Sequence, residues 1–136
     1  MSSFDFGQRI RSGTLIPAQA WNGGDALTTS DALAFDTQGA EGIAVLVNFG
    51  AITAGVDITI KFYEGDANDF TVGEASELDS KYVINSPAMD DTANASYTHS
   101  IKTNKRYLKV EVSRDGTVAA DLSVAAIGGH LSKAPA

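Results

Sequence analysis

Several stretches of this chain alternate apolar and polar side chains one residue at a time. The clearest are residues 56–64 (VDITIKFYE) and 105–113 (KRYLKVEVS). Successive side chains of a β-strand point to opposite faces, so this period of two predicts strands with one buried and one solvated face. A third stretch, residues 43–49 (IAVLVNF), is apolar on nearly both sides and predicts a central or covered strand. No long segment has the 3.6-residue period of a helix, so the pattern restricts the chain to an all-β fold.

The phase of each alternation predicts which side chains lie in the core. From the first two stretches, we expect the core to contain Val56, Ile58, Ile60, Phe62, Leu108, Val110 and Val112. On the side at or toward solvent, we expect from the first stretch Asp57, Thr59 and Lys61, with either Glu64 or Tyr63. From the second stretch we expect Tyr107, Lys109 and Glu111 there.

Weaker strand signals fill the intervals between these stretches. Taken together, the expected strands span residues 14–18, 32–37, 43–49, 56–64, 81–84, 95–101, 105–113 and 118–127. The last two are joined by a short polar turn, Arg114 to Thr117, which predicts a hairpin. Seven or eight short strands separated by turns favour an antiparallel β-sandwich, with a jelly roll as its expected form. We expect a single sandwich domain over residues 14–136, preceded by an N-terminal arm over residues 1–13.

The composition excludes several classes of protein. The chain has no cysteine, which rules out disulfide scaffolds, thiolate zinc sites and cysteine nucleophiles. No apolar run is as long as a membrane span, so no membrane partner is expected. The N-terminus lacks the basic and apolar regions of a secretory signal, so secretion by that route is not expected.

The net charge of −7 is concentrated in one segment. Residues 57–91 hold nine acids and two bases, whereas residues 101–136 hold three acids and six bases. A nucleic-acid-binding protein would show a basic stripe instead, so no nucleic-acid partner is expected. Solvated loops that keep the protein soluble explain the acidic segment. The distribution also fits a dipolar molecule whose basic C-terminal region faces an acidic partner.

The residues able to perform chemistry do not form a catalytic or metal-binding motif. His99 and His130 are too few for a three-histidine zinc site, and no HExxH or GxSxG sequence occurs. His99 shares a strand face with Tyr97 and Ile101, which favours a half-buried, hydrogen-bonded histidine. Residues 66–77 match a calcium loop at three positions but lack its glycine and flanking helices, so solvated turn aspartates are expected; a looser calcium site in the loops stays open. We therefore expect that the protein is not an enzyme and that it binds no cofactor and no metal ion.

Aromatic and arginine side chains near the N-terminus are the best candidates for partner binding, because these residue types dominate interface energetics. Trp21, the sole tryptophan, lies in a predicted loop with two following glycines. There it would either be exposed, to stack on a sugar or anchor an interface, or plug the core at a strand end. The expected contact residues are Phe4, Phe6, Arg9, Arg11 and Trp21.

A series of short segments runs in order through the rest of the chain. It begins with DTQGAEG (residues 36–42), a hydrophobic strand, and residues 57–64 leading to an acidic turn. It continues with YTHSI (97–101) and KRYLKV (105–110), and closes with IGGH (127–130) and Ala134-Pro135. Over roughly residues 30 to 136, this order resembles the small head proteins of tailed bacteriophages, often called decoration or cement proteins.

The resemblance implies a jelly-roll or similar sandwich bound to the outside of an icosahedral capsid. Such proteins bridge neighbouring major capsid subunits, often as homodimers or homotrimers, and have no catalytic residues. It also implies synthesis in the host cytoplasm and a final place on the capsid surface of the virion. Two alternatives remain: a head–tail joining or tail structural protein, and a carbohydrate-binding module, which would expose aromatic side chains around Trp21.

Overall fold

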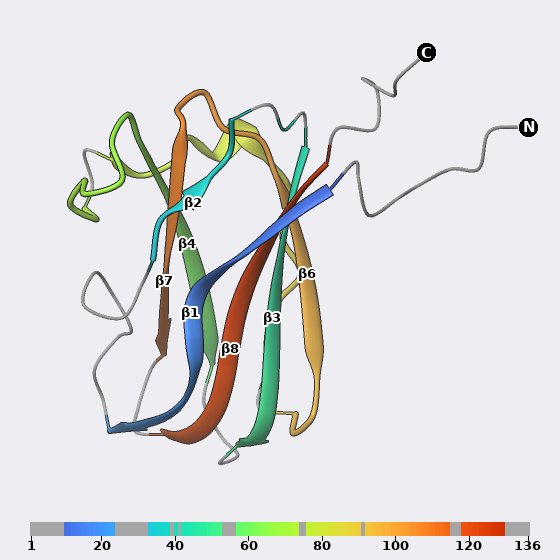
Figure 1. Ribbon diagram of the computed structural model, residues 1–136. Helices are drawn as coiled ribbons and strands as arrows, with labels where there is room; N and C mark the ends of the chain where they lie inside the picture. The colour runs from blue at the N-terminus through green and yellow to red at the C-terminus, as the bar shows by residue number, and fades with distance from the viewer. Residues whose placement is uncertain are drawn as a thin grey trace, which may run out of the picture.

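The computed structural model shows two antiparallel β-sheets that face each other, as predicted for a β-sandwich (Figure 1). It describes residues 10–23, 33–38, 40, 42–52, 57–73, 76–90, 92–114 and 118–129. Each of the eight strands expected from the sequence overlaps a strand of the structure.

Five strands form one sheet and three form the other. The five-stranded sheet has the order β1 (Ile10–Gly23), β8 (Val118–Gly129), β3 (Gly42–Ile52), β6 (Ser96–Ile101), β5 (Val83–Asn85). The three-stranded sheet has the order β2 (Phe35–Asp36), β7 (Tyr107–Arg114), β4 (Ile58–Gly65). A 3-10 turn, Ser80–Tyr82, leads into β5.

The strand pairing is that of a jelly roll. In this fold a long antiparallel ribbon is wound on itself, so that strand 1 pairs with 8, 2 with 7, 3 with 6 and 4 with 5. The first three of these pairs are present. β5 pairs with β6 instead of with β4. Along its open edge, β4 forms the isolated bridges Ile58–Met89 and Tyr63–Glu77.

The core fills the space between the two sheets. β3 shows how the sequence builds it, because Ile43, Val45, Val47 and Phe49 are buried while the residues between them face outward. β7 of the facing sheet contributes the fully buried side chains of Leu108, Val110 and Val112, and the neighbouring strand β8 contributes Val124. One continuous cluster of buried apolar residues therefore joins both sheets.

β1 is longer than the sequence predicted. It begins at Ile10 rather than Thr14, so the last four residues of the expected arm pair with β8. It then runs on to Gly23, through the loop expected around Trp21. Register shifts on either side of Ile16 break the alternation of the strand, which hid its length from a period-two pattern.

The outward side of β4 and β7 is covered where the sequence predicted solvent. Tyr63 and Lys109 are cross-strand neighbours with exposed fractions of only 4% and 8%. The Lys109 ammonium donates a hydrogen bond to the carbonyl oxygen of Phe70 at 2.9 Å and lies 5.0 Å from the centre of the Phe70 ring. Burial, with the charge of Glu111, raises the pKa of Tyr63 to about 12. The prediction of an exposed Lys109 was therefore wrong, because the chain after β4 folds back over this face.

Candidate functional site

Two of the five predicted contact residues fall within the described chain. Phe4, Phe6 and Arg9 precede Ile10 and lie outside the described residues, as does His130. Arg11 and Trp21 both lie in β1, close to its two ends.

Trp21 is a core residue. Its exposed fraction is 2%, it pairs with Ala120 of β8, and it belongs to the buried cluster between the sheets. The structure thus confirms the core alternative for this side chain. A buried indole cannot stack on a sugar or insert into a partner, so Trp21 is removed from the expected contact residues.

Arg11 is exposed, but its guanidinium binds its own chain. One terminal nitrogen, Nη2, donates to the carbonyl oxygens of Asp36 at 2.6 Å and Gln38 at 2.7 Å. The guanidinium carbon lies 5.9 Å from the centre of the Phe35 ring. Arg11 therefore ties the start of β1 to the end of β2, a role that the residue type alone did not reveal.

An ion pair joins two of the segments that carry the phage-protein resemblance. Arg106 donates to both carboxylate oxygens of Asp36, at 3.0 and 3.2 Å. This contact lowers the pKa of Asp36. The Thr37 hydroxyl lies 2.9 Å from the carbonyl oxygen of Lys105 and 2.7 Å from that of Arg106. Residues 36–37 and 105–106 are therefore joined at one end of the sandwich, although almost seventy residues separate them.

His99 is fully buried and only half satisfied. Its Nδ1 forms a 2.8 Å hydrogen bond with the Ser86 hydroxyl, and its ring lies edge-on to Phe62 with centroids 5.8 Å apart. Its Nε2 has no hydrogen-bond partner among the described residues. A serine and a histidine in contact are two components of a nucleophilic site, but a third group that orients the histidine is not found in the described part of the chain. The sequence predicted a half-buried, satisfied histidine, which underestimated its burial.

We expect His99 to make the protein less stable as the pH falls below about 6.5, the ordinary pKa of histidine. Burial lowers the native pKa of His99 below 6.5, so the unfolded chain binds its proton more readily than the native protein does. The contribution of neutral His99 to the free energy of unfolding is thus fully present above the pKa of the unfolded chain. It is lost as the pH falls toward the pKa of His99 in the native protein. Urea unfolding at several pH values, compared between the natural chain and His99→Leu, measures this effect. Equal pH dependence in the two proteins would contradict it.

The looser calcium site that the sequence left open gains no support from the described residues. Among the described residues, no group of three or more acidic or histidine side chains is arranged to hold a metal ion. Asp66 and Asp69 are exposed at the turn after β4, as expected for solvated turn aspartates. No helix in the described residues is both long enough and apolar enough to cross a membrane.

The outward surface of the five-stranded sheet is the largest candidate for an interface. The strands β1, β8, β3 and β6 lie side by side in Figure 1. We define the outer face as the side chains of these four strands that point away from the core. Its described members are Ile10, Ser12, Thr14, Ala18, Ala20, Ala44, Leu46, Asn48, Ser96, Thr98, Ser100, Ala119, Asp121, Ser123, Ala125 and Ile127. Among them only Asp121 is charged. Small and uncharged side chains therefore cover nearly the whole surface.

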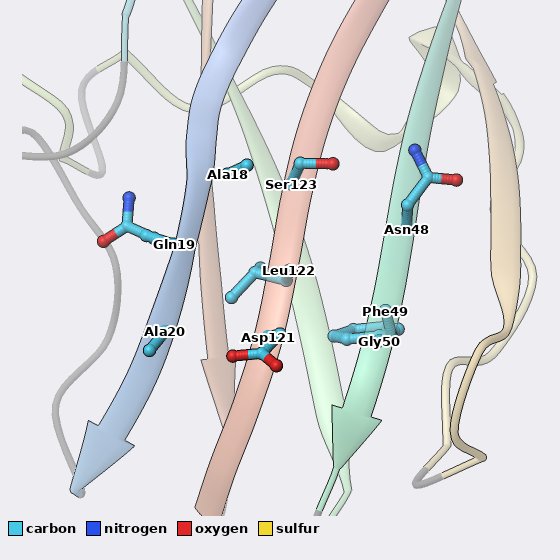
Figure 2. Close-up of a pocket in the computed structure, with 9 residues that line it drawn as sticks. All are labelled: Ala18, Gln19, Ala20, Asn48, Phe49, Gly50, Asp121, Leu122 and Ser123. Atoms are coloured by element: carbon cyan, nitrogen blue, oxygen red, sulfur yellow. The ribbon is translucent and has the colours of Figure 1, made fainter.

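A shallow hollow occupies one end of the outer face (Figure 2). It has a volume of about 440 Å³ and extends across β1, β8 and β3. Its lining residues are Ala18, Gln19, Ala20, Asn48, Phe49, Gly50, Asp121, Leu122 and Ser123. Gly50 leaves space in this hollow, because a Cβ atom there would lie only 3.3 Å from the Cβ of Asp121.

Comparison with known proteins identifies no family for the chain. No protein-family model and no curated protein sequence matches it. One similar solved structure is that of infectious bursal disease virus, Gx strain, with 11% identity over 89% of this chain and a TM-score of 0.48. Another comes from Bacillus endospore appendages, described as a novel family of disulfide-linked pili, with 14% identity and a TM-score of 0.40.

The extents of these two matches differ. The chain spans 33% of the length of the viral protein. The match with the appendage protein covers 95% of this chain and 96% of the appendage protein. Such low identities and TM-scores assign no function.

Proposed function

We propose that this chain is a structural virion protein that binds the outside of an icosahedral phage capsid and stabilises it by bridging major capsid subunits. The jelly-roll strand order carries the proposal, because this fold recurs in viral capsid domains as well as in lectins and cupins. The resemblance to decoration proteins supports the more specific role. In this proposal the chain is made in the host cytoplasm and ends at the capsid surface.

The surface of the domain supports a binding role over a catalytic one. The outer face offers a broad, nearly uncharged area. The Ser86–His99 pair has no group among the described residues that would orient the histidine, and no cluster of three metal-binding side chains is found there. We therefore propose no enzymatic activity and no cofactor.

Stabilisation of the capsid would follow from mass action. A protein that binds the assembled shell but not its free subunits lowers the free energy of the shell with every copy bound. A modest affinity per copy is enough, because an icosahedral shell repeats the same site many times. The chain would bind as a homodimer or homotrimer, so that each oligomer makes two or three contacts with neighbouring capsid subunits.

The contact with the major capsid protein is proposed to involve Phe4, Phe6 and Arg9. Arg11 remains exposed and lies next to them in sequence, but two of its hydrogen bonds hold Asp36 and Gln38. The carbohydrate-binding alternative loses its main residue, because Trp21 is buried.

Counting the copies of this chain in purified virus particles, by quantitative mass spectrometry, tests the proposal. On the order of hundreds of copies are expected for a protein spread over an icosahedral shell. A ring of about six to twelve copies would instead assign the chain to the head–tail joint or the tail. Its absence from particles would refute any virion role.

The double variant Phe4→Ala, Phe6→Ala is expected to bind capsids at least about tenfold more weakly, because buried aromatic side chains dominate interface energetics. Co-sedimentation of purified protein with capsids that lack it measures the affinity. The matched control is Leu33→Ala, which removes an exposed apolar side chain in the described domain. Equal binding by the double variant and the control would exclude these two phenylalanines from the contact.

A further inference from the structure

The two outer surfaces of the sandwich differ sharply in charge. On the three-stranded sheet, β4 and β7 present Lys61 and Glu111 as cross-strand neighbours, with Lys109 beside them under the covering chain. On the outer face of the five-stranded sheet, Asp121 is the one described charge. The whole chain carries a net charge of −7, so two copies repel each other at most orientations. The outer face therefore has fewer charged side chains to remove from water when a second copy covers it.

The outer face also has a shape that can fit itself. Near the middle of β3, the partly exposed Leu46 side chain lies between smaller neighbours, with Ala125 opposite on β8 and Thr98 opposite on β6. The hollow begins at the next outward residue of the same strand, with Asn48 and Gly50 of β3 in its lining. A bulky apolar side chain and a hollow on the same strand become mutual partners when a second copy is turned end over end.

We propose that two copies of this chain associate face to face through the outer face, so that Leu46 of each copy lies in the hollow of the other. The two-fold axis lies in the plane of the interface, perpendicular to the strands, and passes near Ser123 of β8. Under this rotation β3 faces β3 and β8 faces β8, which makes the contact isologous and closed at two copies. Small side chains allow the two sheets to approach to the usual separation of about 10 Å.

The size of the outer face suits a stable but reversible dimer. Four strands about 4.8 Å apart, each contributing about eight residues at 3.3 Å per residue, present about 500 Å² per copy. Burying this area on both copies removes about 1,000 Å² from water, which is near the lower limit for a specific interface. The proposed dimer deepens the self-association part of the proposed function and does not depend on capsid binding.

Sedimentation velocity of the full chain over a range of micromolar concentrations tests the proposal, with the variant Leu46→Asp as the first perturbation. The natural chain is expected to form a monomer–dimer equilibrium, and Leu46→Asp is expected to weaken it at least about tenfold by placing a carboxylate in the hollow. The matched control is Leu33→Asp, which makes the same change at an exposed leucine outside the outer face. A monomeric natural chain, a trimer, or equal weakening by the control would each overturn the proposal.

Two further variants decide the matter even if Leu46→Asp fails to fold. Asp121→Asn removes the one described charge of the face, so it is expected to tighten the dimer several-fold, because two like charges are no longer brought together. Ser123→Cys introduces the sole cysteine of the chain. A short bis-maleimide is expected to link two such copies, because facing sheets lie about 10 Å apart. Ser113→Cys on the other sheet should stay unlinked, and the opposite pattern would place the interface there.

Capsid binding by a monomeric variant separates the two proposals. If Leu46→Asp folds and still binds capsids, with lower avidity, the outer face is the dimer contact. If the natural chain is monomeric and Leu46→Asp abolishes capsid binding, the outer face is the capsid contact and the dimer proposal fails while the virion role stands.

Discussion

Replacing Trp21 with alanine is expected to lower the free energy of unfolding by about 3–5 kcal/mol. The indole is 2% exposed and packs in the cluster shared by both sheets, so its loss removes buried apolar area and leaves a cavity. A domain of this size is typically stable by about 5–15 kcal/mol, so much of its stability would be lost. Urea denaturation followed by circular dichroism measures the change, because the variant has no tryptophan fluorescence.

The matched control is Gln19→Ala, two residues earlier on the same strand, where the side chain is only partly buried and lines the hollow. It is expected to change the free energy of unfolding by less than about 0.5 kcal/mol. If Trp21→Ala proved equally mild and instead abolished partner binding, Trp21 would belong to an interface, as the first of the two sequence interpretations held.

The strands were predictable because local alternation is a direct consequence of strand geometry. Residues 43–49 show this best: their continuous apolar pattern predicted a central strand, and β3 lies between β8 and β6 with Ile43, Val45, Val47 and Phe49 buried. The sequence also favoured a jelly roll, but alternation specifies strands and not their pairing, so the strand order came only from the structure.

The errors have a common physical cause, which is contact between segments far apart in the chain. Lys109 sits in a regular alternation, and only the chain after β4, thirty-nine residues away at Phe70, covers it and accepts its hydrogen bond. The Asp36–Arg106 ion pair likewise joins residues seventy positions apart. Alternation specifies which face a side chain occupies, but not what covers that face.

β1 illustrates the opposite difficulty, in which a long strand lacks a clear local signal. Register shifts on both sides of Ile16 change the phase of its side chains, and its glycines and Pro17 weaken the strand propensity. β1 begins at Ile10, four residues before the expected start of the domain at residue 14, so Arg11 lies in the strand and not in an arm. Since Arg11 binds the carbonyl oxygens of Asp36 and Gln38, this boundary matters for any truncation.

Deleting residues 1–13 is expected to destabilise the domain by about 2–4 kcal/mol, because several backbone and side-chain hydrogen bonds are lost together. The deletion removes the pairing of Ile10 to Gly13 with β8 and the two Arg11 hydrogen bonds. It also uncovers the Phe35 ring, which lies against Gly13 so closely that a Cβ there would be 2.7 Å from it. Thermal and urea unfolding of the truncated protein measure the loss.

Deletion of residues 1–9 is the decisive comparison, because the described strand begins at Ile10. This shorter deletion is expected to leave the unfolding transition within about 0.5 kcal/mol of the natural chain while weakening capsid binding, as proposed for Phe4, Phe6 and Arg9. Equal stability of both truncated proteins would place the domain boundary at residue 14 and make the Arg11 contacts dispensable. A large loss on removing only residues 1–9 would instead make them part of the folded domain, and the proposed capsid contact would have to lie elsewhere on the surface.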